Sequence, residues 1–309
     1  MMHHFDDKIV MASYNLKRDP NLVLNAIYNK KSEHKNKNLF HMFSDNESIL
    51  GCWLELSSSL TDIYSNNVYF MRPFYYNIPE SFDEDCILFN DFWDAFEKSL
   101  QLGDNYYIIH VPATSLNMLN KINSSNLDYS FCGGTSCYYI YKKYNMNERD
   151  FNGDISVRQL DQSDRIIYKN NLLDIASDSF DDYISQYHIS PLTRTRAPLI
   201  YREWIRSNLN DTNMLIVCAF YKNQPIGFST IGQVGNVYEV LLSAVKREFR
   251  SKGVYRDIMR VTIKTCLKGD NLIIISTQID NYIVQRVWAD LGFKPYYTFY
   301  NFHIGAFKL

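Results

Sequence analysis

The sequence predicts an α/β protein, and three observations support this fold class. Along residues 155–304, apolar runs of strand length alternate with amphipathic stretches of helix length, in the order β-α-α-β-β-β-α-β-α-β. A turn at 222–224 joins two of these strands into a hairpin. The 309 residues are 46% hydrophobic and 21% charged, so the chain has an ample core and is not of the disordered class.

The expected elements follow from periodicity and from turn residues. In the C-terminal half we expect strands at 155–159, 214–221, 225–232, 236–245, 271–277 and 296–304, and helices at 162–177, 197–209, 253–267 and 282–290. In the N-terminal half we expect strands at 49–56, 67–71, 106–111 and 136–141, and helices at 91–102 and 114–122. The polar segment 144–153 ends in Asn-Gly and predicts domains at 1–150 and 151–309.

Composition and charge exclude several classes of partner. Lys and Arg number 32 against 34 Asp and Glu, which does not indicate a nucleic-acid-binding surface. The six cysteines form no C-x-x-C pair, so we expect reduced thiols and no metal site. Asp6 and Asp7 lie where a signal peptide would be apolar, and apolar runs such as 214–221 are too short for a membrane span. We therefore expect a cytoplasmic protein with no membrane partner.

The segment 237–259 has the pattern of an anion-binding site. An apolar strand leads into a basic loop, then Gly253, then a helix. The amide groups at a helix N-terminus attract an anion, and Gly253 lets the backbone approach a phosphate closely. Four cationic side chains lie in or beside this loop: Arg247, Arg250, Lys252 and Arg256. A bound pyrophosphate and a plain basic turn before a surface helix are both compatible with this pattern.

The loop and the segment 277–293 together resemble the GCN5-related N-acetyltransferase (GNAT) superfamily. The loop, RSKGVY at 250–255, is similar to the acyl-CoA pyrophosphate signature of that superfamily, from which Tyr255 departs at the last position. Asn281 and the Leu-Gly-Phe of 291–293 are similar to its next motif. The resemblance covers 153–304 and implies the GNAT fold, a mixed and mainly antiparallel twisted sheet flanked by helices.

The resemblance also implies where an acyl-CoA would bind. Its pyrophosphate would lie on the loop, formed by Arg250, Ser251, Lys252, Gly253, Val254 and Tyr255. Backbone groups of Ser243 and Val245 would bind the amides of the pantetheine arm, and Asn281 would contact the same arm. A strand amide near Leu242 would hold the oxyanion of the tetrahedral intermediate.

Two titratable side chains are candidates for proton transfer. Glu239 lies fourteen residues before Gly253, at the offset where relatives of the histone acetyltransferases carry a general base; the alternative is a solvated strand residue. Many members carry a general-acid Tyr on the helix after Asn281, where this sequence has Trp288. Tyr255 is our candidate acid in its place, with Tyr282 as a second choice; otherwise the thiolate leaves unprotonated or catalysis is lost.

The segment 181–204 is similar to a narrower group, the bacterial nucleotide-sugar N-acyltransferases. That group acylates dTDP-linked amino-dideoxy sugars. The matching candidates for acceptor binding are Tyr187, His188, Arg194, Arg196, Tyr201 and Trp204. His188 would bind the sugar or take its proton, unless it caps a helix end. The two arginines would hold phosphates, unless they form a solvated basic turn.

The resemblance to this group extends to the N-terminal half. Residues 107–112, the helix after them and 131–141 look like the incomplete second GNAT-like domain of these enzymes, for which we expect a structural role. The implied function is transfer of an acetyl or 3-hydroxybutanoyl group from acyl-CoA to a nucleotide-linked amino sugar for surface polysaccharide such as O-antigen lipopolysaccharide.

Two alternatives to this function stay open. One is a GNAT enzyme acting on a peptide or small-molecule amine. The other is a non-catalytic acyl-CoA sensor, which Trp288 would favour because the usual Tyr is missing. A homodimer through the edge of the last strand, 296–304, is a further hypothesis, because aromatic edge strands tend to be covered.

Overall fold

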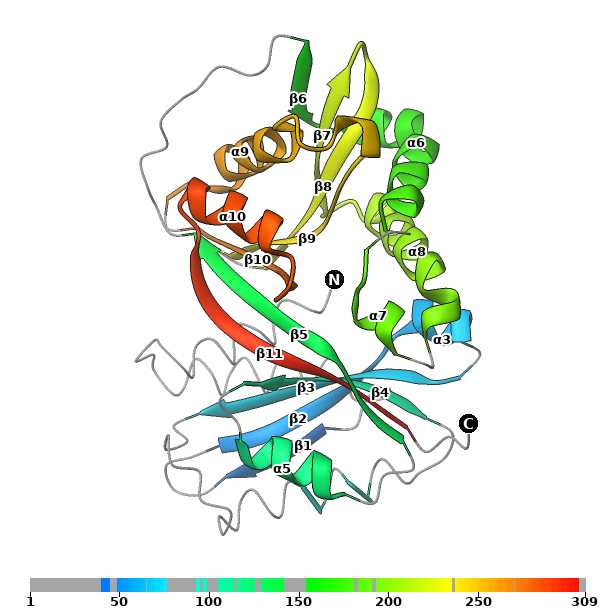
Figure 1. The fold of residues 1–309 in the computed structure, drawn as a ribbon, viewed down its shortest axis with the longest axis vertical. Helices are drawn as coiled ribbons and strands as arrows, with labels where there is room; N and C mark the ends of the chain where they lie inside the picture. The colour runs from blue at the N-terminus through cyan, green and yellow to red at the C-terminus, as the bar shows by residue number, and fades with distance from the viewer. Residues whose placement is uncertain are drawn as a thin grey trace. The chain divides into compact units, whose positions relative to one another are not determined.

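The structure of the chain is a computed structural model. It describes residues 40–44, 49–64, 66–76, 93–94, 97–98, 105–113, 116–125, 129–141, 154–180, 183–190, 193–234, 237–269 and 271–305. By packing, the chain forms two compact units: unit 1 consists of 1–134 and 299–309, and unit 2 of 135–298 (Figure 1). The predicted boundary segment 144–153 lies outside the described residues, as do Asp6 and Asp7. The predicted domains 1–150 and 151–309 stay a prediction.

Unit 1 is built on a sheet in the order β1-β2-β3-β4-β11. The strands are β1 (Phe40–Ser44), β2 (Ile49–Leu56), β3 (Val68–Tyr76), β4 (Tyr106–Pro112) and β11 (Lys294–Gly305, of which 299–305 belong to this unit), and the helices are α3 (Ser58–Tyr64) and α5 (Leu116–Ser124). Pairing of β3 with β4 is parallel, and the other pairs are antiparallel. In the core, Tyr106 hydrogen-bonds to His303, and burial lowers the pKa of that imidazole to about 3. His303 is therefore neutral at physiological pH.

Pairing of the last strand corrects one expectation. Residues 299–305 of β11 are hydrogen-bonded to β4. This stretch is not a free edge, so the reason for expecting a homodimer there is removed. The expected helix at 91–102 is helical at its described residues 93–94 and 97–98, and its remaining residues lie outside the described part of the chain.

Unit 2 is a mixed sheet in the order β5-β10-β9-β8-β7-β6. Its strands are β5 (Tyr129–Tyr141, of which 135–141 belong to this unit), β6 (Ile155–Gln159), β7 (Leu215–Tyr221), β8 (Gln224–Val234), β9 (Val237–Val245) and β10 (Leu272–Gln278). Only β9 and β10 are parallel among these described pairs, and the rest are antiparallel. The helices are α6 (Gln162–Phe180), α7 (Gln186–Ile189), α8 (Ala197–Asn210), α9 (Val254–Cys266) and α10 (Tyr282–Leu291).

The two faces of this sheet are covered by different helices. Ile231 of β8 belongs to a buried cluster with Ile258 of α9 and Trp288 of α10. Its neighbour Thr230 points to the opposite face, because side chains alternate along a strand. There the amide of Asn208 on α8 donates to the Thr230 hydroxyl at 2.9 Å. Figure 1 shows α9 and α10 on one side of β8, and α6 and α8 on the other.

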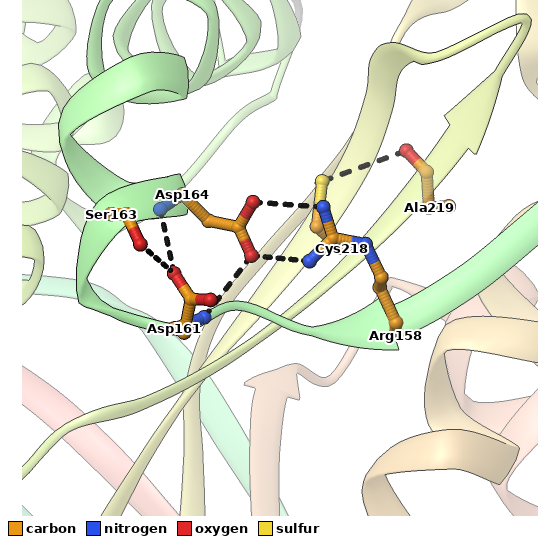
Figure 2. Close-up of polar contacts among 6 residues, drawn as sticks. All are labelled: Arg158, Asp161, Ser163, Asp164, Cys218 and Ala219. Carbon is orange, nitrogen blue, oxygen red and sulfur yellow. Dashed lines mark hydrogen bonds and ion pairs between the residues drawn. The ribbon is translucent and has the colours of Figure 1, made fainter.

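Helix α6 begins at a reciprocal capping arrangement, which Figure 2 shows. The backbone N–H of Asp164 donates to the Asp161 carboxylate at 2.8 Å, and the N–H of Asp161 donates back to the Asp164 carboxylate at 3.2 Å. Arg158 of β6 donates to both oxygens of Asp164, and this bond holds the pKa of the Asp164 carboxyl below its usual range. The start of α6 is thus anchored to the neighbouring strand.

The cysteines in the described part of the chain agree with the expectation of reduced thiols. Cys132, Cys137, Cys218 and Cys266 are free thiols. Burial raises the pKa of Cys137 to about 11 and that of Cys266 to about 12, which keeps both protonated and unreactive at neutral pH.

Gly227 allows close packing between β8 and the elements around it. A Cβ atom at this position would lie 2.9 Å from the carbonyl oxygen of Ala244 and 3.1 Å from Cδ1 of Ile258. Since the first contact is with backbone, we expect Gly227→Ala to lower the free energy of unfolding by about 1–3 kcal/mol. Urea unfolding measures this. Ser207→Ala, at an exposed position of α8, is the control, and equal stability of the two variants would contradict the packing argument.

Candidate functional site

Strands β9 and β10 part within unit 2. Their parallel pairing runs from Val237 and Leu272 to Val240 and Ile275. Beyond this pair β9 continues to Val245, paired with β8 on its other side, and β10 continues to Gln278, paired with β5 on its other side. The inner backbone groups of 241–245 are therefore directed toward the space between two diverging strands, apart from the Val245 carbonyl, which accepts from Arg250 Nε and Ser179 Oγ. A ligand with amide groups, such as a pantetheine arm, can pair with backbone of this kind.

A β-bulge lies where the strands part. Along β8 and β9, Ile231 pairs with Val240 and Thr230 with Leu242, so Leu241 is the extra residue. The bulge shifts the alternation of side chains by one residue. As a result Ser243 lies on the same face as α9, whereas Leu242 lies on the face of α6 and α8. The sequence alone gives no signal for this shift.

The basic loop has the local geometry of an anion-binding turn. After the short helix η2 (Arg247–Phe249), the backbone is left-handed at Ser251, with φ 60°, and again at Gly253, with φ 83°. Gly253 is the N-cap residue of α9 and Val254 its first residue. Consecutive N–H groups ahead of a helix N-terminus form a concavity that favours a phosphate. The loop therefore fits the pyrophosphate expected at 250–255.

The cationic side chains of this loop differ in their partners. Arg250 donates through Nε to the Val245 carbonyl at 3.1 Å and through Nη2 to the Ser179 carbonyl at 3.3 Å, which ties the loop to the end of α6. Arg256 forms an ion pair with Asp290 of α10 at 2.5 Å. The ammonium of Lys252 lies over a neighbouring aromatic ring and is exposed. Phosphate binding by Arg250 and Lys252 stays a prediction.

We expect the left-handed backbone of Gly253 to matter for binding of the acyl donor. Alanine at φ 83° costs about 1–2 kcal/mol. No clash adds to this cost, because a Cβ there would meet no atom within 4 Å. Gly253→Ala should thus raise KM for acyl-CoA about 5–30-fold.

Gly269→Ala is the matched control for that change. Gly269 has φ 60° and equally open surroundings, but it lies in the turn after α9. The free loop of Gly253→Ala should relax out of the left-handed conformation, which donor binding must restore, so only Gly253→Ala should change KM. Equal KM values would contradict a role of the loop in donor binding.

Glu239 is a buried carboxylate on β9, with 7% of its surface exposed. It pairs with Gly232 of β8 and Ile274 of β10, just before the two strands part. Its neighbours Tyr238 and Val240 pack into the cluster under α9, so Glu239 points to the opposite face, where α6 and α8 lie. Glu239 is therefore buried, and the alternative of a solvated strand residue is wrong. Its role as general base stays a prediction.

Tyr255 and Trp288 are joined by a hydrogen bond. The indole Nε1–H of Trp288 donates to the Tyr255 hydroxyl at 2.8 Å. Ser243 is a second hydrogen-bond partner of that hydroxyl, and its own Oγ lies 2.7 Å from Oγ of Ser229. Burial raises the pKa of Tyr255, so the phenol is protonated at neutral pH. Tyr282, the other candidate acid, is 69% exposed at the start of α10.

Thr277, near the end of β10, is the centre of a second hydrogen-bonded cluster. Asn281 donates its side-chain amide to the Thr277 hydroxyl at 3.0 Å, and Tyr183 Oη lies 3.3 Å from the same oxygen. Burial raises the pKa of Tyr183. Asn281 is thus held at the N-terminus of α10 beside the diverging strand, where the resemblance places a pantetheine contact. Tyr183 and Thr277 were not predicted from the sequence as site residues.

Most predicted acceptor residues form an aromatic stack centred on Tyr201. Its ring stacks on Phe180, with 4.1 Å between centroids, and on Trp204, with 6.2 Å. His188 stacks on it at 6.0 Å, and Tyr187 meets it edge-on at 6.2 Å. Tyr201 is only 4% exposed and Tyr187 only 6%, so both rings pack α6, α7 and α8 together. His188 and Trp204 are half-buried and have more surface to offer an acceptor.

His188 takes part in the capping of α7. Its Nδ1 lies 2.9 Å from Oγ of Ser185 and accepts from the Ser185 N–H at 3.4 Å, while the Ser185 side chain accepts from the Tyr187 N–H. This is the capping role that the sequence left open as an alternative. Arg194 and Arg196 are exposed in the short helix η1 (Arg194–Arg196), as expected for the basic-turn alternative. Acceptor binding by these residues stays a prediction.

Comparison with known proteins gives a family match for the segment that contains these residues. Residues 172–293 match the profile of the Acetyltransferase (GNAT) family. Unit 2 has the GNAT fold. The matched segment runs from within α6 past the end of α10, so it contains β9, the loop and the Trp288 helix. The match supports acyl transfer of the GNAT kind as the general activity.

Solved structures agree on the fold. A GNAT-family acetyltransferase from Colwellia psychrerythraea has a TM-score of 0.53 at 12% identity, covering 96% of this chain and 94% of that one. A GNAT protein from Sphaerobacter thermophilus has 0.53 at 10% identity, covering 85% and 82%. A tandem GNAT protein of the clavulanic acid biosynthesis pathway has 0.50 at 10% identity, covering 99% and 94%, which supports the predicted two-domain arrangement. No curated protein matches the sequence significantly.

The predicted fold class is thereby confirmed, as a GNAT fold whose mixed sheet is flanked by helices. Acyl-CoA is the co-substrate that this fold implies, and the diverging strands and the left-handed loop fit it. Among the described residues, no group of three or more His, Cys, Asp and Glu side chains is arranged to hold a metal ion. None of the helices in the described ranges has the length and apolar character of a membrane span.

Proposed function

We propose that this chain is an acyl-CoA-dependent N-acyltransferase that acylates the amine of a nucleotide-linked amino-dideoxy sugar, a dTDP-3-amino- or dTDP-4-amino-dideoxyhexose. The acyl group would be acetyl or 3-hydroxybutanoyl, and the product would serve surface polysaccharide such as O-antigen lipopolysaccharide. The observation that carries the transferase part is the parting of β9 and β10 directly before the left-handed loop of α9. We expect the reaction to take place in the cytoplasm.

The reaction would be direct attack in a ternary complex. The neutral amine attacks the thioester carbonyl, a C–N bond forms, and the C–S bond breaks. Glu239 is our base for the amine proton, directly or through water, and His188 is the alternative. Glu239 is supported by its burial on the face of α6 and α8, the face that also carries the aromatic stack. A backbone amide near Leu242, beside the bulge, would hold the oxyanion.

The amino-sugar acceptor is supported by the segment that precedes and opens α8. His188 and Trp204 offer partly exposed rings of the kind on which a sugar or a base packs, and Arg194 and Arg196 offer exposed cations near them in the sequence. This support is chemical and does not choose the sugar. A peptide or other small-molecule amine is the competing class of acceptor.

The test is thiol release from acetyl-CoA and from 3-hydroxybutanoyl-CoA, each with a panel of dTDP- and UDP-linked 3-amino and 4-amino sugars. Release with one sugar and its amide product by mass spectrometry would establish the acceptor and the acyl group together. Release only with peptide amines or unlinked small-molecule amines would overturn the sugar assignment. Binding of acetyl-CoA without release for any amine would favour a sensor.

A further inference from the structure

Trp288 occupies the helix position where the superfamily resemblance leads one to expect a tyrosine. Its indole makes packing contacts and one hydrogen bond. The side chain is 1% exposed and packs in the cluster of α9 and α10. Its ring meets that of Tyr139 edge-on, with 5.3 Å between centroids. The single polar atom, Nε1, is satisfied by the Tyr255 hydroxyl at 2.8 Å.

The direction of this hydrogen bond determines where the phenol proton can point. An indole N–H is a donor only, so Tyr255 is the acceptor and keeps its own proton for another partner. The neighbouring partner is on β9, at Ser243, in the stretch 241–245 that has parted from β10. The hydroxyl therefore lies beside the backbone that fits the pantetheine arm, with its proton held away from Trp288.

We propose that Trp288 is a positioning residue, which holds the Tyr255 hydroxyl so that its proton is directed to the β9 side at Ser243, where it can transfer to the sulfur of a bound acyl-CoA. The acid function thus lies on α9 instead of α10, and the Trp of α10 orients it. This inference rests on the proposed transferase function. As the C–S bond breaks, the electron pair stays on sulfur and the phenol proton moves to it; the proton lost by the amine leaves through the base, and solvent reprotonates Tyr255.

The first test is a double-mutant cycle on thiol release. Trp288→Phe should lower kcat about tenfold and leave KM for acetyl-CoA unchanged. In the Tyr255→Phe background the same change should have no further effect, because residues that act as a unit are not additive. An equal loss in both backgrounds, a loss in KM alone, or an unchanged kcat would overturn the proposal.

Two further variants separate positioning from packing. Replacing Trp288 by 3-benzothienylalanine keeps the fused ring and removes only the N–H donor, and it should reproduce the kcat of Trp288→Phe with wild-type thermal stability. Tyr139→Phe is the matched control: it removes the hydrogen bond to Gln285 beside the indole and leaves Tyr255 untouched, so kcat should stay unchanged. Wild-type kcat with 3-benzothienylalanine would overturn the proposal.

A readout without an acceptor distinguishes failure of this inference from failure of the proposed function. The indole ¹⁵N–¹H signal of Trp288, identified by its loss in Trp288→Phe, should shift strongly in Tyr255→Phe. A shifted signal in a protein that releases no thiol with any amine would support the contact and reject the transferase function. An unshifted signal would reject the contact whatever the activity.

Discussion

Replacing Glu239 by glutamine is expected to lower kcat by about 10²–10⁴-fold, the usual contribution of a general base. An amine attacks a thioester only as the neutral base, so a proton must leave its nitrogen, and a glutamine amide cannot accept that proton. The substitution preserves shape, and Glu239 lies between Gly232 and Ile274 where the strands are still paired. KM for acyl-CoA should therefore remain within about twofold. Steady-state thiol release measures both constants.

Glu97→Gln provides a control for the Glu239 experiment. Glu97 belongs to unit 1, so this change removes the same charge outside the GNAT unit. Its kcat should equal that of the wild type. A Glu239→Gln enzyme with wild-type turnover would remove the base assignment and direct the search to His188. A rise in KM with unchanged kcat would instead identify Glu239 as a binding residue.

Replacing Tyr255 by phenylalanine is expected to lower kcat about 100-fold, the smaller end of the general acid range, because a thiolate is already a fair leaving group. Loss of the hydroxyl also leaves the indole N–H of Trp288 without its acceptor inside the core. The variant should thus melt at a lower temperature as well. Thiol release and thermal unfolding measure the two effects separately.

The pH dependence provides an independent check on Tyr255. Burial raises its pKa above the ordinary value of about 10, so the phenol keeps its proton through the physiological range. Titration of this acid should therefore cause no fall in kcat below about pH 9.5. An alkaline fall near pH 8 that Tyr255→Phe abolishes would contradict this pKa direction, and a wild-type kcat for Tyr255→Phe would remove it as the acid.

The fold of unit 2 was largely predictable from the sequence because its signals are local. The strand 155–159 alternates apolar and polar residues at its start, Asp161 caps the helix after it, and the loop at Gly253 needs a left-handed residue that glycine supplies. In unit 2 the short helix α7 was missed, and in unit 1 the strand β1, the helix α3 and residues 129–134 of β5 were missed. Their sequences carry many polar or aromatic residues and lack a clean period.

The site was predictable only in part, because several of its properties come from tertiary contacts. Three of its features depend on residues distant in sequence: the Leu241 bulge, the bond between Trp288 and Tyr255, and the grouping of Tyr183 with Thr277. No spacing rule specifies them. The helix-capping role of His188 was foreseeable from Ser185 three residues earlier, which is the spacing of a capping box.

Strand β5 contributes residues to both units, and this limits where the gene can be divided or recombined. Residues 136–141 supply the antiparallel partner of β10, although they precede the predicted boundary at 150 and 151. A protein beginning at 151 would expose the backbone of 273–278 as an unprotected edge, rich in Ile and prone to pair with other chains. One strand of the unit 2 sheet is therefore encoded before the predicted boundary. Insertions, fusions and proteolytic trimming near that boundary would disturb the strand that pairs with β10, one of the two strands that we propose hold the acyl donor.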